Sequence, residues 1–249
     1  MEQIDIKDVP VFHNKAMRNG HFKVCAIIVA AGNGVRMGTD KMCSLLGGMS
    51  VIARTAQIFF KSRLFDEIII VASKKNTEFI SEEMKKYNVC AKIVLGGATR
   101  GESSYNGIRA TNADIVLIHD GARPFTEKAI IKNVIEGAID CGAAAPGVTP
   151  KDTIKLINDD GMVDCTLPRE KCVNIQTPQG FNRDIILNAY EKHGFSETDD
   201  CAVAERSGVS IKIVDGSYKN IKLTTPEDLL TAAKFIENWG TDYAYWERI

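Results

Sequence analysis

The sequence predicts an α/β protein with a doubly wound, mostly parallel sheet, and two features of its first 150 residues indicate this class. Short segments rich in β-branched residues alternate with longer amphipathic segments. The short segments are continuously apolar, which is typical of strands that helices cover on both faces. An alternation of this kind favours a layered sheet with helices on each side. Strands are expected at residues 24–29, 68–72, 91–95, 115–118 and 143–148.

Helical periodicity fills the gaps between these strands. It is clearest between Ile130 and Ala138, where apolar residues recur on one face of the helix expected at residues 127–141. The same spacing predicts helices at residues 51–60, 76–87 and 103–111.

A different rhythm begins after Pro150. Two short strands are expected at residues 153–157 and 162–166, and Asp160-Gly161 between them is a strong hairpin-turn signal. We expect this hairpin to form a projecting β-arm at about residues 150–175. An arm without a partner would leave strand edges exposed, so it is a candidate dimerisation element.

The last third of the sequence returns to the α/β pattern. Helices are expected at residues 182–192 and 199–207, with Thr198 as the N-cap of the second, and a strand at residues 211–214. Thr225, Pro226 and the acids after them predict an N-cap and first turn for a helix that runs to Trp239. We expect one domain over residues 23–249 and an N-terminal extension over residues 1–22.

Composition excludes several classes of protein. Lysine plus arginine number 31 and aspartate plus glutamate 32, so the net charge of -1 gives no basic excess for nucleic acid. The longest apolar run, Val24 to Ala31, is too short to span a membrane. The seven cysteines are scattered and form no C-x-x-C pair, so we expect free thiols and a cytoplasmic protein.

The glycine-rich segment after the first strand has three candidate interpretations. A dinucleotide fingerprint is disfavoured because the third glycine, Gly38, comes one residue late and no acid ends the second strand. That disfavours a nicotinamide dehydrogenase. A Walker loop is disfavoured because its Gly-Lys-Ser/Thr string does not occur. A nucleotidyltransferase loop remains, in which small residues let backbone amides approach a triphosphate while Arg36 and Lys41 supply cations.

Further motifs follow this loop in a fixed order, and together they identify a family. With the loop, they resemble the 2-C-methyl-D-erythritol 4-phosphate cytidylyltransferase family, over about residues 23–240. The resemblance implies a Rossmann-like nucleotidyltransferase fold, CTP and a polyol phosphate as substrates, Mg²⁺ on the triphosphate, and a homodimer joined through the β-arm. The motifs lie at residues 96–104 (GGATRGESS), 119–125 (HDGARPF), 151–153 (KDT), 176–179 (QTPQ), 198–200 (TDD) and 220–224 (NIKLT).

The resemblance also implies roles for particular residues. Arg36, Lys41 and Lys222 match catalytic positions at the reacting phosphates. The positions that match cytidine-binding residues are Ala30, Ala31, Gly32, Gly97, Ser103 and Asp120. Those that match acceptor-binding residues are Asp120, Arg123, Thr153, Arg169, Thr177 and Lys222, of which Arg169 and Thr177 would come from the arm of the neighbouring subunit. Asp120 is also the candidate ligand of the metal.

Two departures from the family pattern leave alternatives open. Asp40 replaces the usual proline before Lys41. This departure leaves open the alternative that the protein is a non-catalytic homologue that binds the nucleotide. Gly121 replaces the commoner alanine, as in the related ribitol-5-phosphate cytidylyltransferases, which make a CDP-alcohol for cell-wall polymers. His119 is expected to be a structural histidine, because an acceptor phosphate is already ionised and needs no general base.

Overall fold

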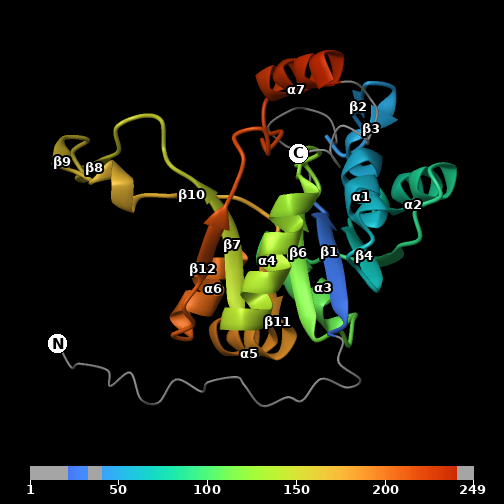
Figure 1. Cartoon of the computed structure of the whole chain (residues 1–249), viewed down its shortest axis with the longest axis horizontal. Helices are drawn as coiled ribbons and strands as arrows, with labels where there is room; N and C mark the ends of the chain where they lie inside the picture. The colour runs from blue at the N-terminus through green and yellow to red at the C-terminus, as the bar shows by residue number, and fades with distance from the viewer. Residues whose placement is uncertain (1–21, 33–40, 240–249) are drawn as a thin grey trace.

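The structure, a computed structural model, describes residues 22–32 and 41–239. Within them, an eight-stranded sheet forms the centre of the molecule (Figure 1). Its strands are β1 (Val24–Ala30), β4 (Glu67–Ala72), β5 (Lys92–Leu95), β6 (Ile115–Asp120), β7 (Ala143–Val148), β10 (Asn174–Ile175), β11 (Gln179–Asn182) and β12 (Lys212–Asp215).

The sheet is mostly parallel, as predicted. Its order is β10-β7-β11-β6-β1-β4-β5, and β12 also pairs with β7. β1 runs parallel to β4 and β6, β4 to β5, and β12 to β7, whereas β10 and β11 are antiparallel to their neighbours. The carboxyl ends of β1, β4, β5 and β6 therefore meet at one edge of the sheet.

Helices cover both faces of the sheet, which confirms the doubly wound class. Side chains of β1 alternate between the two layers: Ala26 and Ile28 pack on one side, Cys25 and Ile27 on the other, and all four are fully buried. The first layer contains α1 (Val51–Ser62), α2 (Thr77–Lys86), α4 (Lys128–Cys141) and α7 (Pro226–Trp239); the second contains α3 (Arg100–Arg109), α5 (Arg183–His193) and α6 (Asp200–Arg206).

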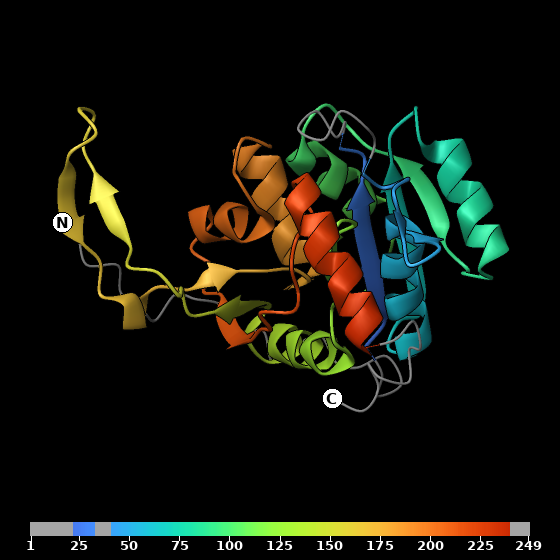
Figure 2. The same cartoon turned by 90° about the horizontal axis from the view of Figure 1, so that it is seen from above.

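The predicted hairpin is present and projects away from the sheet (Figures 1 and 2). It consists of β8 (Lys155–Ile157) and β9 (Val163–Thr166), and a short 3-10 helix, Arg169–Lys171, follows it. Gly161 in its turn has a φ of 77°, a conformation that favours glycine. Leu156, Ile157 and Val163 expose roughly half or more of their surface, so the arm has little apolar packing of its own.

Some local features differ from the sequence prediction. The N-cap of α6 is Asp199, whose carboxylate accepts the Ala202 N–H, so the prediction of Thr198 was wrong by one residue. Two short strands, β2 (Leu45–Leu46) and β3 (Met49–Ser50), were not predicted, nor were β10 and β11. Of the helices that the structure describes, none is both long enough and apolar enough to cross a bilayer.

Candidate active site

A cavity of about 500 Å³ opens where the carboxyl ends of β1, β4, β5 and β6 meet. Ligands bind at this edge in open α/β sheets, and the volume is within the usual range for small-molecule sites. Backbone of the first glycine-rich segment and of the loop after β5 forms much of the lining. The lining residues are Val29, Ala30, Ala31, Gly32, Lys41, Met42, Ser73, Lys74, Gly96, Gly97, Ala98, Thr99, Arg100, Ser103, Asp120, Gly121, Ala122, Lys222 and Thr224.

The loop between β5 and α3 packs closely against the end of β1. A Cβ at Gly96 would lie 2.5 Å from the Cβ of Ala31, so only glycine fits there. The Ser103 hydroxyl accepts the Gly97 N–H at 3.1 Å and donates to the Thr99 carbonyl at 2.8 Å. These contacts fix the backbone groups that face the cavity.

Asp120, the last residue of β6, binds cations that come from three segments. Its Oδ1 accepts from Nε of Arg100 at 3.1 Å, and its Oδ2 lies 2.8 Å from Nζ of Lys222 and 3.7 Å from Nε of Arg123. Burial would raise the pKa of this carboxyl, but the three cations outweigh burial and hold it below its usual range. Asp120 is therefore an ionised counter-ion inside a group of cations.

A polar network lies beneath Asp120. The Asp120 N–H donates to the Thr177 hydroxyl at 3.1 Å, and that hydroxyl lies 3.0 Å from Nδ1 of His119. Nε2 of His119 lies 3.1 Å from the Arg123 carbonyl, so the neutral ring donates there and accepts from Thr177. Nη1 of Arg123 donates to the Asn220 carbonyl at 2.7 Å. The network joins β6 to the loop that bears Lys222.

His119 has the structural position expected from the sequence. It is fully buried, and its ring lies 4.7 Å from the ring of Phe59. Burial lowers the pKa of His119 to about 3, with the nearby cations Arg123 and Lys222 acting in the same direction. The imidazole is thus neutral at physiological pH.

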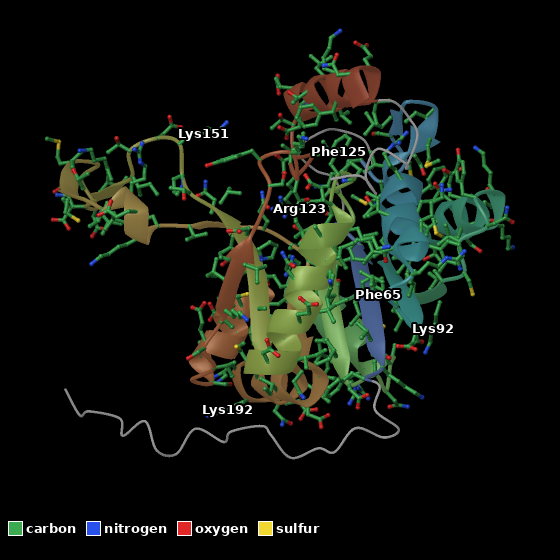
Figure 3. All side chains as sticks on the ribbon, viewed as in Figure 1. Phe65, Lys92, Arg123, Phe125, Lys151 and Lys192 are labelled. Atoms are coloured by element: carbon green, nitrogen blue, oxygen red, sulfur yellow. The ribbon has the colours of Figure 1, made fainter. Side chains whose placement is uncertain are left out.

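The cavity brings together eight of the residues that the sequence singled out. They are Ala30, Ala31, Gly32, Lys41, Gly97, Ser103, Asp120 and Lys222. Arg36 lies outside the described residues, as does Asp40. Arg123 lies behind Asp120 rather than in the cavity lining, and Figure 3 shows it at the top of the sheet beneath Phe125.

The residues expected from a neighbouring arm divide into two groups. Thr153 and Arg169 lie exposed at the base of the arm, where Nη1 of Arg169 donates to the Lys151 carbonyl at 3.0 Å. Thr177 is not on the arm. It is buried beneath Asp120 in the same subunit, because β10 has already returned the chain to the sheet, and this placement corrects the sequence expectation.

The lining residues to which the sequence analysis gave no role include Lys74, Arg100 and Thr224, of which Arg100 and Thr224 lie within its motifs. Arg100 had a usable signal, because it opens α3, where a cation is unfavourable to the helix dipole. Nη1 of Arg100 also lies 2.8 Å from Oδ2 of Asp200. Burial opposes the charge of Arg100, but Asp200 and Asp120 together raise the pKa of its guanidinium.

Among the residues that the structure describes, the side chains at the cavity do not form a protein-held metal site. Within residues 22–32 and 41–239, no cluster of three His, Cys, Asp or Glu side chains could hold a metal. Asp120 is surrounded by cations, and Asp200 is fully buried against Arg100. A hard divalent cation needs several oxygen ligands, which this donor set does not supply.

A doubly wound sheet with glycine-rich loops and a group of cations around one cavity is the architecture of a nucleotidyltransferase, and the chain falls in this class. A family model described as 2-C-methyl-D-erythritol 4-phosphate cytidylyltransferase matches residues 24–238. The chain therefore belongs to that family.

Individual relatives agree with the family match. A protein of Clostridium acetobutylicum named 2-C-methyl-D-erythritol 4-phosphate cytidylyltransferase is 46% identical to this chain, and the match covers 86% of this chain and 97% of that protein. A protein of the same name from Dehalococcoides mccartyi is 44% identical, and the match covers 84% of this chain and 94% of that protein. A solved structure from Anaerococcus prevotii, titled 4-diphosphocytidyl-2C-methyl-D-erythritol synthase, has a TM-score of 0.79 at 35% identity, covering 87% of this chain and 96% of that one.

Proposed function

We propose that this enzyme transfers CMP from CTP to 2-C-methyl-D-erythritol 4-phosphate and releases pyrophosphate, a step in isoprenoid precursor synthesis. The observation that supports this proposal most is the cavity that joins glycine-rich backbone to a cluster of cations, in a chain that matches relatives of that name along nearly their whole length. The free thiols are consistent with a cytoplasmic enzyme.

The glycine-rich wall of the cavity would bind the nucleoside. Ala30, Ala31, Gly32 and Gly97 present backbone groups rather than bulky side chains, and Ser103 holds the Gly97 N–H in place. Nδ2 of Asn76 donates to the Ala30 carbonyl at 3.0 Å and so fixes the end of β1 from below. A preformed backbone surface of this kind recognises a base without the entropy cost of ordering long side chains.

The cationic wall would bind the phosphates. An oxygen of the acceptor phosphate attacks the α-phosphorus of CTP, a new P–O bond forms, and the bond to the β-phosphate oxygen breaks as pyrophosphate leaves. Negative charge grows on the α-phosphoryl oxygens and on the leaving group, and fixed cations stabilise it. Lys41 and Lys222 face the cavity for this role, and Arg36 is proposed to join them. Asp120 would lie at the nucleotide and acceptor hydroxyls.

Mg²⁺ would enter this site with the nucleotide. Since the donors within the described residues do not form a cation cage, the ion would be held mainly by triphosphate oxygens and water, with Asp120 as its candidate protein ligand. We therefore regard the magnesium complex of CTP as the substrate.

The arm would complete the site in a homodimer. Arg169 and Thr153 are exposed at its base, and its apolar side chains Leu156, Ile157 and Val163 would be covered by a second copy. Mixed dimers of Arg169→Ala and Lys222→Ala subunits should regain part of the activity that each homodimer lacks, if Arg169 serves the neighbouring cavity. Mixed dimers without any regained activity would refute the sharing of residues.

The decisive experiment measures pyrophosphate release with CTP, Mg²⁺ and one of two acceptors, 2-C-methyl-D-erythritol 4-phosphate or ribitol 5-phosphate. Turnover with the first supports the proposal, whereas preferential turnover with the second assigns a pentitol phosphate instead. Binding of CTP in calorimetry without turnover of either acceptor would indicate a non-catalytic homologue.

A further inference from the structure

A buried carboxylate lies behind the cavity and has no part in the chemistry described above. Asp200, the first residue of α6, is fully buried. Its Oδ1 accepts from the Tyr190 hydroxyl at 2.5 Å, and its Oδ2 lies 2.8 Å from Nη1 of Arg100. Nε of the same guanidinium donates to Asp120 at 3.1 Å, so Arg100 bridges two carboxylates.

Burying such a charge is costly, and packing alone does not require it. A buried ion pair is often replaced by apolar residues with no loss of stability, because desolvation offsets its attraction. Tyr190 and Phe195 already supply apolar surface between α3 and α5, with ring centroids 5.8 Å apart. The charge on Asp200 is therefore better explained by what it does to Arg100 than by cohesion of the helices.

The bridge determines how many oxygens of Asp120 remain for Lys222. A guanidinium with no second partner prefers to bind both oxygens of one carboxylate. In the structure Nε of Arg100 binds Oδ1 of Asp120 while Nη1 of the same group is held by Asp200, so the guanidinium cannot turn to pair with both oxygens of Asp120, and Oδ2 is left to Lys222. Lysine at position 100 could not do this, since one ammonium cannot span two separate acceptors as the guanidinium fork does.

We propose that Asp200 is a positioning residue that, through Arg100, fixes the Asp120 carboxylate and with it the ammonium of Lys222 at the cavity. Loss of the negative charge at position 200 lets Arg100 take both oxygens of Asp120 and displaces Lys222. The inference rests on the proposed role of Lys222 at the reacting phosphates.

The test is Asp200→Asn, which removes the charge and keeps the size of the side chain and one of its two acceptor oxygens. We expect kcat to fall roughly 10- to 100-fold, the scale of a misplaced catalytic group, with a much smaller change in KM for CTP. Arg100→Lys should lose kcat to a similar degree because its bridge is broken. Both variants are assayed well below their melting temperatures.

Asp199→Asn is the matched control, because it removes a neighbouring carboxylate from the same helix end without touching Arg100. Asparagine is also a good N-cap, so α6 should be retained and kcat unchanged. Tyr190→Phe keeps the Asp200–Arg100 pair. This variant should have a lower melting temperature than wild type and only a small change in kcat. An Asp200→Asn enzyme with wild-type kcat, or an equal loss of kcat in Asp199→Asn, overturns the proposal.

A readout independent of turnover separates this inference from the proposed function. Lys222 is 38% exposed at its side chain, so an amine-acylating reagent can reach it, and peptide mass spectrometry gives its labelling rate. Release from Asp120 should raise that rate about two- to fivefold in Asp200→Asn and in Arg100→Lys, since a partly exposed ion pair is weak. An unchanged rate in the folded variants refutes the positioning role even if no acceptor is turned over. Inactive wild-type protein would refute the proposed function alone.

Discussion

Replacement of His119 by glutamine should remove a pH dependence of stability that its burial creates. Burial and the neighbouring cations lower the pKa of His119 from its ordinary value of 6.5 to about 3, so the unfolded chain binds a proton that the folded chain resists. The stabilising contribution of the neutral ring is fully present above pH 6.5 and is lost as the pH falls toward 3. Below pH 6.5 the free energy of unfolding falls by about 1.4 kcal/mol per pH unit, which gives a loss of about 2 kcal/mol between pH 6.5 and 5.

The assay is urea unfolding of wild type and His119→Gln at several pH values between 7.5 and 5. Glutamine retains a donor for the Arg123 carbonyl but does not titrate. We expect the variant to be less stable than wild type at pH 7.5. Its free energy of unfolding should then fall by about 2 kcal/mol less than that of wild type when the pH is lowered to 5. The pKa of Asp120 is held below its usual value, so this carboxylate does not contribute in this window. Parallel curves for the two proteins would refute the argument that His119 is neutral in the fold.

Three further predictions concern the cavity. Lys222→Ala should lower kcat by roughly 10²–10³ in the pyrophosphate-release assay, whereas Lys219→Ala in the same loop and outside the cavity lining should not; equal effects would contradict a specific role. Ser103→Ala should raise KM for CTP while kcat changes less, because the Gly97 N–H loses the acceptor that orients it; an unchanged KM would refute this. Gly121→Ala should destabilise the fold by about 1–3 kcal/mol in urea unfolding, because its Cβ would lie 3.1 Å from Sδ of Met42 and 3.1 Å from the Val29 carbonyl; wild-type stability would show that Met42 moves aside without cost.

The parallel part of the fold could be predicted from the sequence because its strands are continuously apolar. The antiparallel strand β11 could not, since its four residues, Gln179–Asn182, include only one apolar side chain, Phe181. Gln179 is buried there, and its side-chain Oε1 accepts the N–H groups of Asp200 and Cys201 at the start of α6. A polar residue whose partner is about 20 positions away gives no periodic signal.

The candidate site shows the same limit. Motif resemblance predicted Asp120 and Lys222, and the structure places them 2.8 Å apart. It did not predict that Arg100 joins Asp120 to Asp200, because the three residues come from β6, α3 and α6 and meet only through packing of the second helix layer. The expected position of Thr177 on the arm was wrong for a related reason, since this position depends on where the chain rejoins the sheet after the arm.

Gly121 illustrates why a family departure needs a structural explanation before it is used to assign a substrate. On the sequence alone, this glycine left a pentitol phosphate open as an alternative acceptor. In the structure a Cβ at this position would press on Met42, Ile52 and the Val29 carbonyl, which belong to the protein rather than to a bound acceptor. Packing therefore offers an explanation of the glycine that needs no particular acceptor, and Gly121 by itself does not assign one.

The near-neutral charge of the whole chain is compatible with binding a polyanion because the cations are concentrated. Arg100, Arg123 and Lys222 all lie within 3.7 Å of one carboxylate, and Lys41 and Lys74 line the same cavity. Asp120 and Asp200 compensate only part of this charge, so the cavity is locally positive although the chain carries -1. Long-range attraction of CTP is then modest and short-range contacts dominate, so that binding depends more on the placement of each cation than on the net charge.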